Sequence, residues 1–165
     1  MLIYHPAYDA YHCIFRLLKI VQVTKSIEIS KLRILDFYLV FPSEISKIRL
    51  TEKTEIKKLA NNFQNIYHGP VNAYQTFRDM QDLQLAAIST LIASKIIDSE
   101  KASLGIIHKT TEPLPEELTF KHDGIEDEDN KINDFILNYL SKINLNGTDG
   151  LKHRTGLMEY RYDNV

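Results

Sequence analysis

The sequence has little of what stabilises a secreted or membrane-spanning protein. It contains a single cysteine, Cys13, so no disulfide can form within the chain and a reducing compartment is expected. No run of about 18 apolar residues is present, which argues against a membrane-spanning helix. The first residues also lack the basic and apolar regions of a signal peptide. Together these absences predict a cytoplasmic protein.

The chain also lacks the motifs of common catalytic sites. Neither Gly-x-x-x-x-Gly-Lys nor Gly-x-Gly-x-x-Gly occurs, so nucleotide hydrolysis by this chain alone is not expected. The histidines have no metal-binding spacing and there is no Cys/His cluster, so no metal or cofactor is predicted. Asp9 and His12 share a predicted helix face, where a carboxylate could orient a general base. Because no nucleophile motif accompanies them, we interpret them as a structural polar pair and predict no enzymatic activity.

What the chain does contain is an ordinary globular composition with an uneven charge. Hydrophobic residues make up 44% of the 165 residues and charged residues 25%, which is enough for a full core. Residues 1–111 hold 14 Lys and Arg against 10 Asp and Glu, whereas residues 112–165 hold 6 against 12. Binding of nucleic acid needs clustered cations, so the mild excess in the first part does not predict strong independent DNA binding.

Apolar periodicity predicts a mainly helical domain. A helix is expected over residues 8–22, where apolar side chains recur every three or four positions. Residues 31–41 are apolar on nearly all sides, which predicts a helix in the centre of the core. Ser30 is expected to cap that helix and Pro42 to end it. Ile27 and Ile29, two apart, indicate a short strand between the two helices. Three more helices are expected around 56–63, from about 72 onwards, and over 130–144.

The order of elements near the middle of the chain predicts a β wing. An apolar helical run over residues 83–93 is followed by two short β segments, Ile96-Ile97 and 104–107, with a turn near 99–103. A helix followed by a short hairpin is how a winged-helix domain ends. The predicted fold class is therefore mainly α with a small β wing, a winged-helix-like helical domain (α+β). We expect residues 1–111 to form this core.

Residues 112–165 are expected to pack on that core. They comprise an acidic loop over 123–129, the last helix, and a tail from 146 onwards with little regular structure. The tail segment 151–162 mixes cations with aromatic side chains, which could stack on bases and pair with phosphates of nucleic acid. We favour docking of this segment along the domain as a peptide.

Five residues are candidates for binding a partner. Arg33 and Asp36 place charges on a very apolar helix, where each charge must be paired or must reach an edge. They could form an ion pair within the chain or contact a partner chain. Arg154, Tyr160 and Arg161 are the tail candidates, because the tail mixes cations with aromatic side chains that could contact another subunit.

Three stretches of the sequence resemble a known family. They are residues 4–13 (YHPAYDAYHC), 32–42 (LRILDFYLVFP) and 157–162 (LMEYRY). The sequence is similar to the small middle components of bacterial ABC-three-component systems, whose operons encode an SMC-like ATPase, a middle component and an effector. Lamassu-type anti-phage defence belongs with these systems.

The resemblance implies a non-enzymatic helical subunit with a winged-helix-type fold. Such a subunit would sit on the head region of the SMC-like ATPase and position the effector until foreign DNA is sensed. Its partners would be the ATPase and the effector, with DNA reached only through the complex and no membrane. The alternative is a winged-helix DNA-binding transcription regulator. That alternative needs polar or cationic groups on the helix before the wing, where Gln84, Ser89, Thr90 and Ser94 are available but no cation precedes Lys95.

Overall fold

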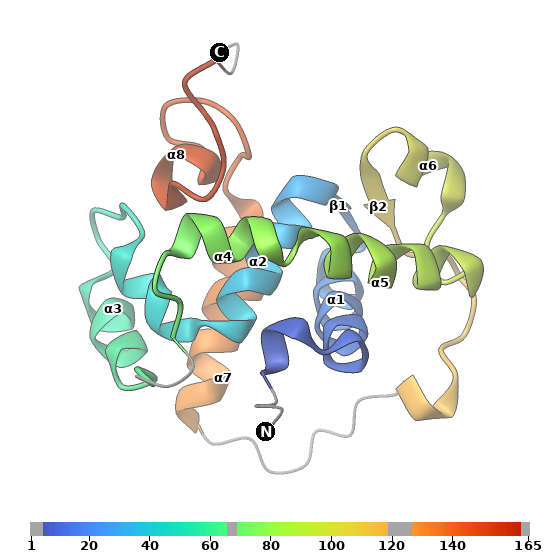
Figure 1. The fold of residues 1–165 in the computed structure, drawn as a ribbon, viewed down its shortest axis with the longest axis horizontal. Coiled ribbons are helices and arrows are strands. Elements are labelled where there is room, and N and C mark those ends of the chain that lie inside the picture. The colour runs from blue at the N-terminus through green and yellow to red at the C-terminus, as the bar shows by residue number, and fades with distance from the viewer. Residues whose placement is uncertain (1–4, 66–68, 119–126, 163–165) are drawn as a thin grey trace.

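The computed structural model describes residues 5–65, 69–118 and 127–162, and these form a mainly helical fold with a two-stranded antiparallel sheet (Figure 1). The predicted fold class, mainly α with a small β wing, is confirmed at this level. No helix in these ranges combines the length and apolar character needed to cross a membrane.

The first two helices follow the predicted pattern closely. A 3-10 turn, η1 (Pro6–Tyr8), leads into α1 (Ala10–Thr24), whose N-terminus is capped by the Asp9 side chain. Strand β1 (Ser26–Glu28) separates α1 from α2 (Ile29–Val40). Every residue of α2 from Lys31 to Tyr38 is buried, which places this helix at the centre of the core as predicted. The N-cap is Glu28, so the prediction for Ser30, which lies inside the helix, was wrong.

Two shorter helical segments follow α2. Pro42 ends the helix as predicted and opens η2 (Pro42–Lys47), because proline tolerates a first-turn position but cannot continue the preceding helix. Helix α3 (Thr54–Asn61) packs against η2 and buries Ala60. These two segments form the left-hand side of the molecule in Figure 1.

Helices α4 (Ala73–Asp79) and α5 (Gln81–Ala93) run across the front of the molecule in Figure 1. The side chain of Asn72 caps α4 by accepting a hydrogen bond from the backbone of Gln75. The inner side of α5 packs along α1 and buries Ala87, Ile88 and Leu91. The helical run expected from residue 72 is thus two helices that join at Met80.

The wing differs from a simple hairpin. After the short helix α6 (Ser99–Ser103), strand β2 (Ile106–His108) pairs with β1, in the register Ser26 to His108 and Glu28 to Ile106. The predicted partner, Ile97, forms only an isolated bridge to Lys109 on the other side of β2. The predicted pairing of Ile96-Ile97 with 104–107 was therefore wrong: Ile97 meets Lys109, just after β2, and β2 itself pairs with β1, which lies far away in sequence.

The C-terminal part adds its apolar side chains to the same core. A turn, η3 (Glu116–Leu118), precedes α7 (Asp127–Asp134), which continues into a π-helical turn, η4 (Phe135–Tyr139), and a 3-10 turn, η5 (Leu140–Lys142). This segment corresponds to the helix predicted over 130–144. Ile136 and Leu140 on it are fully buried. Residues 123–126 of the predicted acidic loop lie outside the described residues, and residues 127–129 belong to α7.

The tail is more regular than predicted. It contains a short helix, α8 (Leu151–Thr155), which ends at Gly156 in the left-handed conformation that glycine adopts without strain. Leu151 and Leu157 are buried and belong to the hydrophobic core.

Candidate functional site

Asp36 is the centre of a buried polar network. Its carboxylate is fully buried on α2 and accepts hydrogen bonds from Arg16 on α1, at 2.6 Å from Nε and 3.4 Å from Nη2. Arg16 also donates from Nη1 to the Pro6 carbonyl at 3.0 Å. The Arg16–Asp36 ion pair therefore joins α1, α2 and the N-terminal turn in the core.

Gln84 extends this network to α5. Its amide nitrogen donates to Asp36 Oδ2 at 2.8 Å and to the Arg33 carbonyl at 3.3 Å, and its amide oxygen accepts from Arg33 Nε at 2.9 Å. The Arg33 guanidinium also lies over the Phe77 ring, 4.6 Å from its centroid. Burial lowers the pKa of Arg33, and the nearby Asp36 charge opposes that shift. We call Arg16, Arg33, Asp36 and Gln84 the core network.

Two of the predicted partner-binding residues are thus used inside the chain. Asp36 is 0% exposed and Arg33 is 7% exposed, and both are hydrogen-bonded within the core. No sequence pattern predicted Arg16 as a member of the network, and Gln84 was predicted only as a possible groove-contacting group. The position of Gln84 in the sequence could have indicated its burial. Helical spacing places it on the inner side of α5 with the apolar residues Ala87, Ile88 and Leu91.

The outer side of α5 after Asp82 is exposed and uncharged. No charged residue lies between Asp82 and Lys95. The exposed positions carry small or apolar side chains: Leu85, Ala86, Ser89, Thr90, Ala93 and Ser94, which we call the α5 face. The Ser89 and Thr90 hydroxyls each lie 3.0 Å from the helix carbonyl four residues earlier, to which they donate. These two hydroxyl donors are satisfied within the helix.

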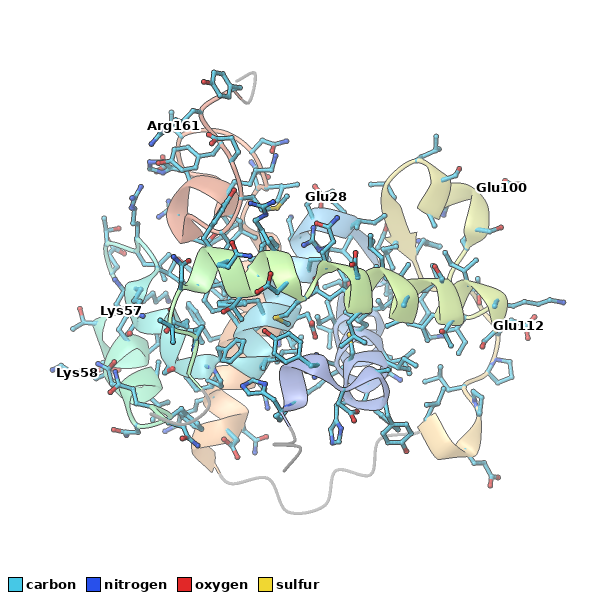
Figure 2. All side chains as sticks on the ribbon, viewed as in Figure 1. Glu28, Lys57, Lys58, Glu100, Glu112 and Arg161 are labelled. Atoms are coloured by element: carbon cyan, nitrogen blue, oxygen red, sulfur yellow. The ribbon has the colours of Figure 1, made fainter. Side chains whose placement is uncertain are left out.

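The three predicted tail residues have different roles. Arg154 donates from Nε to the Asp149 carbonyl at 2.6 Å and from Nη1 to the Arg49 carbonyl at 2.9 Å, so it fixes α8 to the loop after η2. Tyr160 is half-buried and packs edge-on against His153, with 5.0 Å between the ring centroids. Arg161 is exposed near the C-terminal end of the described chain (Figure 2). Of the three, only Arg161 is exposed.

The Asp9–His12 pair acts as a helix cap. Asp9 Oδ1 accepts from the backbone N–H of His12 at 2.8 Å and lies 2.9 Å from the His12 ring nitrogen Nδ1. These hydrogen bonds lower the pKa of Asp9. Nearby Cys13 is buried, and that burial raises the pKa of its thiol to about 12, the opposite of an activated nucleophile. Within the part of the chain that the structure describes, no group of three or more His, Cys, Asp or Glu residues could hold a metal ion.

Comparison with known proteins gives one result. No curated protein and no solved structure shows a significant match to the chain. A model of the family described as ABC-three component (ABC-3C) system Middle Component 5 matches residues 2–163, which is nearly the whole sequence. The chain therefore belongs to this family of middle components of ABC-3C systems.

Proposed function

We propose that the protein is a non-enzymatic bridging subunit that links the heads of an SMC-like ATPase to an effector in anti-phage defence. Membership of the ABC-3C middle-component family makes other components of such a system its partners. The observation that carries the proposal is the α5 face, an exposed helix side with no charge over more than two turns.

The α5 face suits a protein partner better than DNA. The cores of protein interfaces are depleted in charged residues, and small side chains allow two helices to approach closely. A DNA-reading helix instead needs cationic or amide side chains directed into the groove. Gln84 is fully buried in the core network, and the Ser89 and Thr90 hydroxyls bond their own helix. These contacts disfavour the transcription-regulator alternative.

A bridging subunit needs two separate contact surfaces, and the fold provides two candidates. The α5 face lies across the front of the molecule in Figure 1, whereas α8 and the C-terminal end project at its upper edge. We assign one partner to the α5 face and the other to the tail, where Tyr160 and Arg161 lie. Arg154 supports this second surface by fixing α8 in place.

The test is co-purification with the products of the neighbouring genes. Co-expressed ATPase and effector should be retained by the affinity-tagged chain. The substitution Ser89→Arg puts a charge into the α5 face. It should weaken retention of one partner at least tenfold, because an unpaired charge buried in the interface is costly. Ser103→Arg is the matched control, since Ser103 is also an exposed serine bonded to a helix carbonyl but lies on α6.

The proposal is supported if the Ser89→Arg chain no longer retains one partner while the Ser103→Arg chain still does. A wild-type chain that retains neither partner contradicts it. The absence of catalysis is tested separately with the double variant Asp9→Ala/His12→Ala. Protection of cells from phage should be unchanged in that variant if the pair only caps α1.

A further inference from the structure

A cationic cleft lies between α3 and α8, away from the α5 face. It encloses about 310 Å³. Its polar lining consists of Arg49, Thr51, Lys57, Asp149, His153 and Arg154. Two segments more than ninety residues apart in sequence build it, joined by a backbone hydrogen bond from the Arg49 N–H to the Arg154 carbonyl at 2.9 Å.

The lining has a net positive charge. Arg49, Lys57 and Arg154 face one carboxylate, Asp149, whose side chain is 85% exposed and lies 3.4 Å from Arg154 Nη2. Since such an exposed carboxylate is well solvated, it neutralises the cleft only weakly. The cleft therefore favours an anion.

Arg49 and Lys57 have hydrogen-bond donors available for a ligand. Arg154 uses its Nε and Nη1 groups on the Asp149 and Arg49 carbonyls, so its role is to build the cleft. Arg49 makes only 3.4 Å contacts, from Nη1 to His153, and Lys57 Nζ makes one 3.4 Å contact to the Leu50 carbonyl. Among the residues that the structure describes, neither Arg49 nor Lys57 is in an ion pair. Their remaining N–H groups can bind an oxyanion.

The surroundings favour an extended polyanion over a small one. Segments 47–58 and 149–154, which build this side, contain seven Lys and Arg against three Asp and Glu, although the whole chain has a net charge of −2. Lys58 is exposed beyond the cleft, on the same side of the view as Lys57, whereas Glu100 and Glu112 lie at the opposite side (Figure 2). Cations spread along a surface match the regularly spaced phosphates of a nucleic-acid backbone.

We propose that this cleft binds a backbone phosphate of nucleic acid, with Arg49 and Lys57 as the donors. The contact is independent of base sequence, because phosphates fix position and only base edges carry sequence information. This contact goes beyond the bridging role. It would let the chain bind nucleic acid directly, although its overall charge does not predict such binding. Binding should be weak and steeply dependent on salt, as for other phosphate contacts.

The experiment measures fluorescence anisotropy of a labelled duplex of about 20 base pairs with the purified full chain, between about 50 and 200 mM salt. The double variant Arg49→Ala/Lys57→Ala should weaken binding about tenfold at low salt and reduce the slope of log K against log salt by about one, the value for loss of one phosphate contact. The matched control is Arg78→Ala/Lys101→Ala, which removes the same charge from exposed positions on α4 and α6. It should change binding by less than about twofold. Lys57→Gln alone should lose part of the affinity and guards against misfolding of the double variant.

Any of four results would overturn the proposal. The wild-type chain could show no salt-dependent duplex binding, or it could bind pyrophosphate but no duplex. Duplex affinity could also fall equally in the double variant and its control, or stay unchanged in Lys57→Gln. Pyrophosphate binding without duplex binding would make the cleft a site for small phosphates. Co-purification with the ATPase and effector should be unaffected by Arg49→Ala/Lys57→Ala. Failure of this inference is therefore distinguishable from failure of the bridging role.

Discussion

The core network and the cationic cleft use the same types of side chain in opposite ways. In the core network, Arg16 and Arg33 are directed at groups inside the chain, Asp36 and Gln84, which are both fully buried. In the cleft, Arg49 and Lys57 make only long contacts. One region therefore joins helices, and the other leaves charge available for a ligand.

The difference shows that burial determines which arginines are structural. A charge removed from water must be paired and hydrogen-bonded, and loss of one partner leaves an uncompensated charge. A charge at the surface is solvated, so leaving it without a close partner costs little. Substitutions in the first region should thus change folding, and substitution of Arg49 or Lys57 in the second should change binding alone.

The largest expected effect is that of Asp36→Ala. It leaves Arg16 without its only ion-pair partner in the described structure and removes the closer of the two acceptors of the Gln84 amide. The free energy of unfolding should fall by about 3–5 kcal/mol, measured by urea denaturation. The control Asp149→Ala, which removes the exposed carboxylate of the cleft, should change it by less than about 0.5 kcal/mol. Similar values for the two variants would contradict the distinction between the regions.

Gln84→Ala should have the next largest effect. It removes the amide that connects α5 to Asp36 and Arg33, and both charged partners stay buried. The expected loss of stability is about 2 kcal/mol. In a double-mutant cycle with Asp36→Ala the two effects should be clearly non-additive. Additive effects would mean that the contacts do not form one network.

Arg154→Ala and Arg49→Ala compare a structural arginine with a ligand-binding one in the same cleft. Arg154→Ala removes the bonds to the Asp149 and Arg49 carbonyls and should cost about 1–2 kcal/mol, with faster proteolysis around α8. Arg49→Ala should change stability by less than about 0.5 kcal/mol, because its side chain is exposed. Equal losses of stability in the two variants, measured by calorimetry and proteolysis, would contradict the distinction between these two arginines.

At neutral pH the smallest effect is that of Cys13, which lies beside the core network and changes stability only at alkaline pH. Burial, with a smaller contribution from the Asp36 charge, raises the pKa of its thiol to about 12. The folded protein therefore keeps this proton while the unfolded chain loses it, so stability is constant below the ordinary thiol pKa and falls as pH rises towards about 12. Urea denaturation from about pH 8 to about pH 11 should show a steeper decline for the wild type than for Cys13→Ala. Parallel profiles would show that the thiol titrates normally.

Much of the fold was predictable because local signals agreed with it. Apolar spacing predicted α1, the all-round apolar character of residues 31–41 predicted the central position of α2, and Pro42 marked its end. The strand near Ile27 was also correct. Its partner was not predicted, because pairing of β1 with β2 depends on packing between segments about eighty residues apart.

The candidate site was less predictable for the same reason. The sequence identified Arg33 and Asp36 as unusual charges on an apolar helix. Their partners, Gln84 and Arg16, lie on other helices, and no local pattern indicates which side chains meet. The cleft depends on the docking of α8 near Arg49, more than a hundred residues away. Overall charge concealed it, since acidic segments elsewhere outweigh its cations.

The claim that the protein acts by holding other subunits is tested most directly by native mass spectrometry of the co-expressed operon products. We predict that the chain is found in one particle with both the ATPase and the effector, and that particles lacking the chain do not contain the other two together. An ATPase–effector particle that forms equally well without the chain would contradict the bridging role.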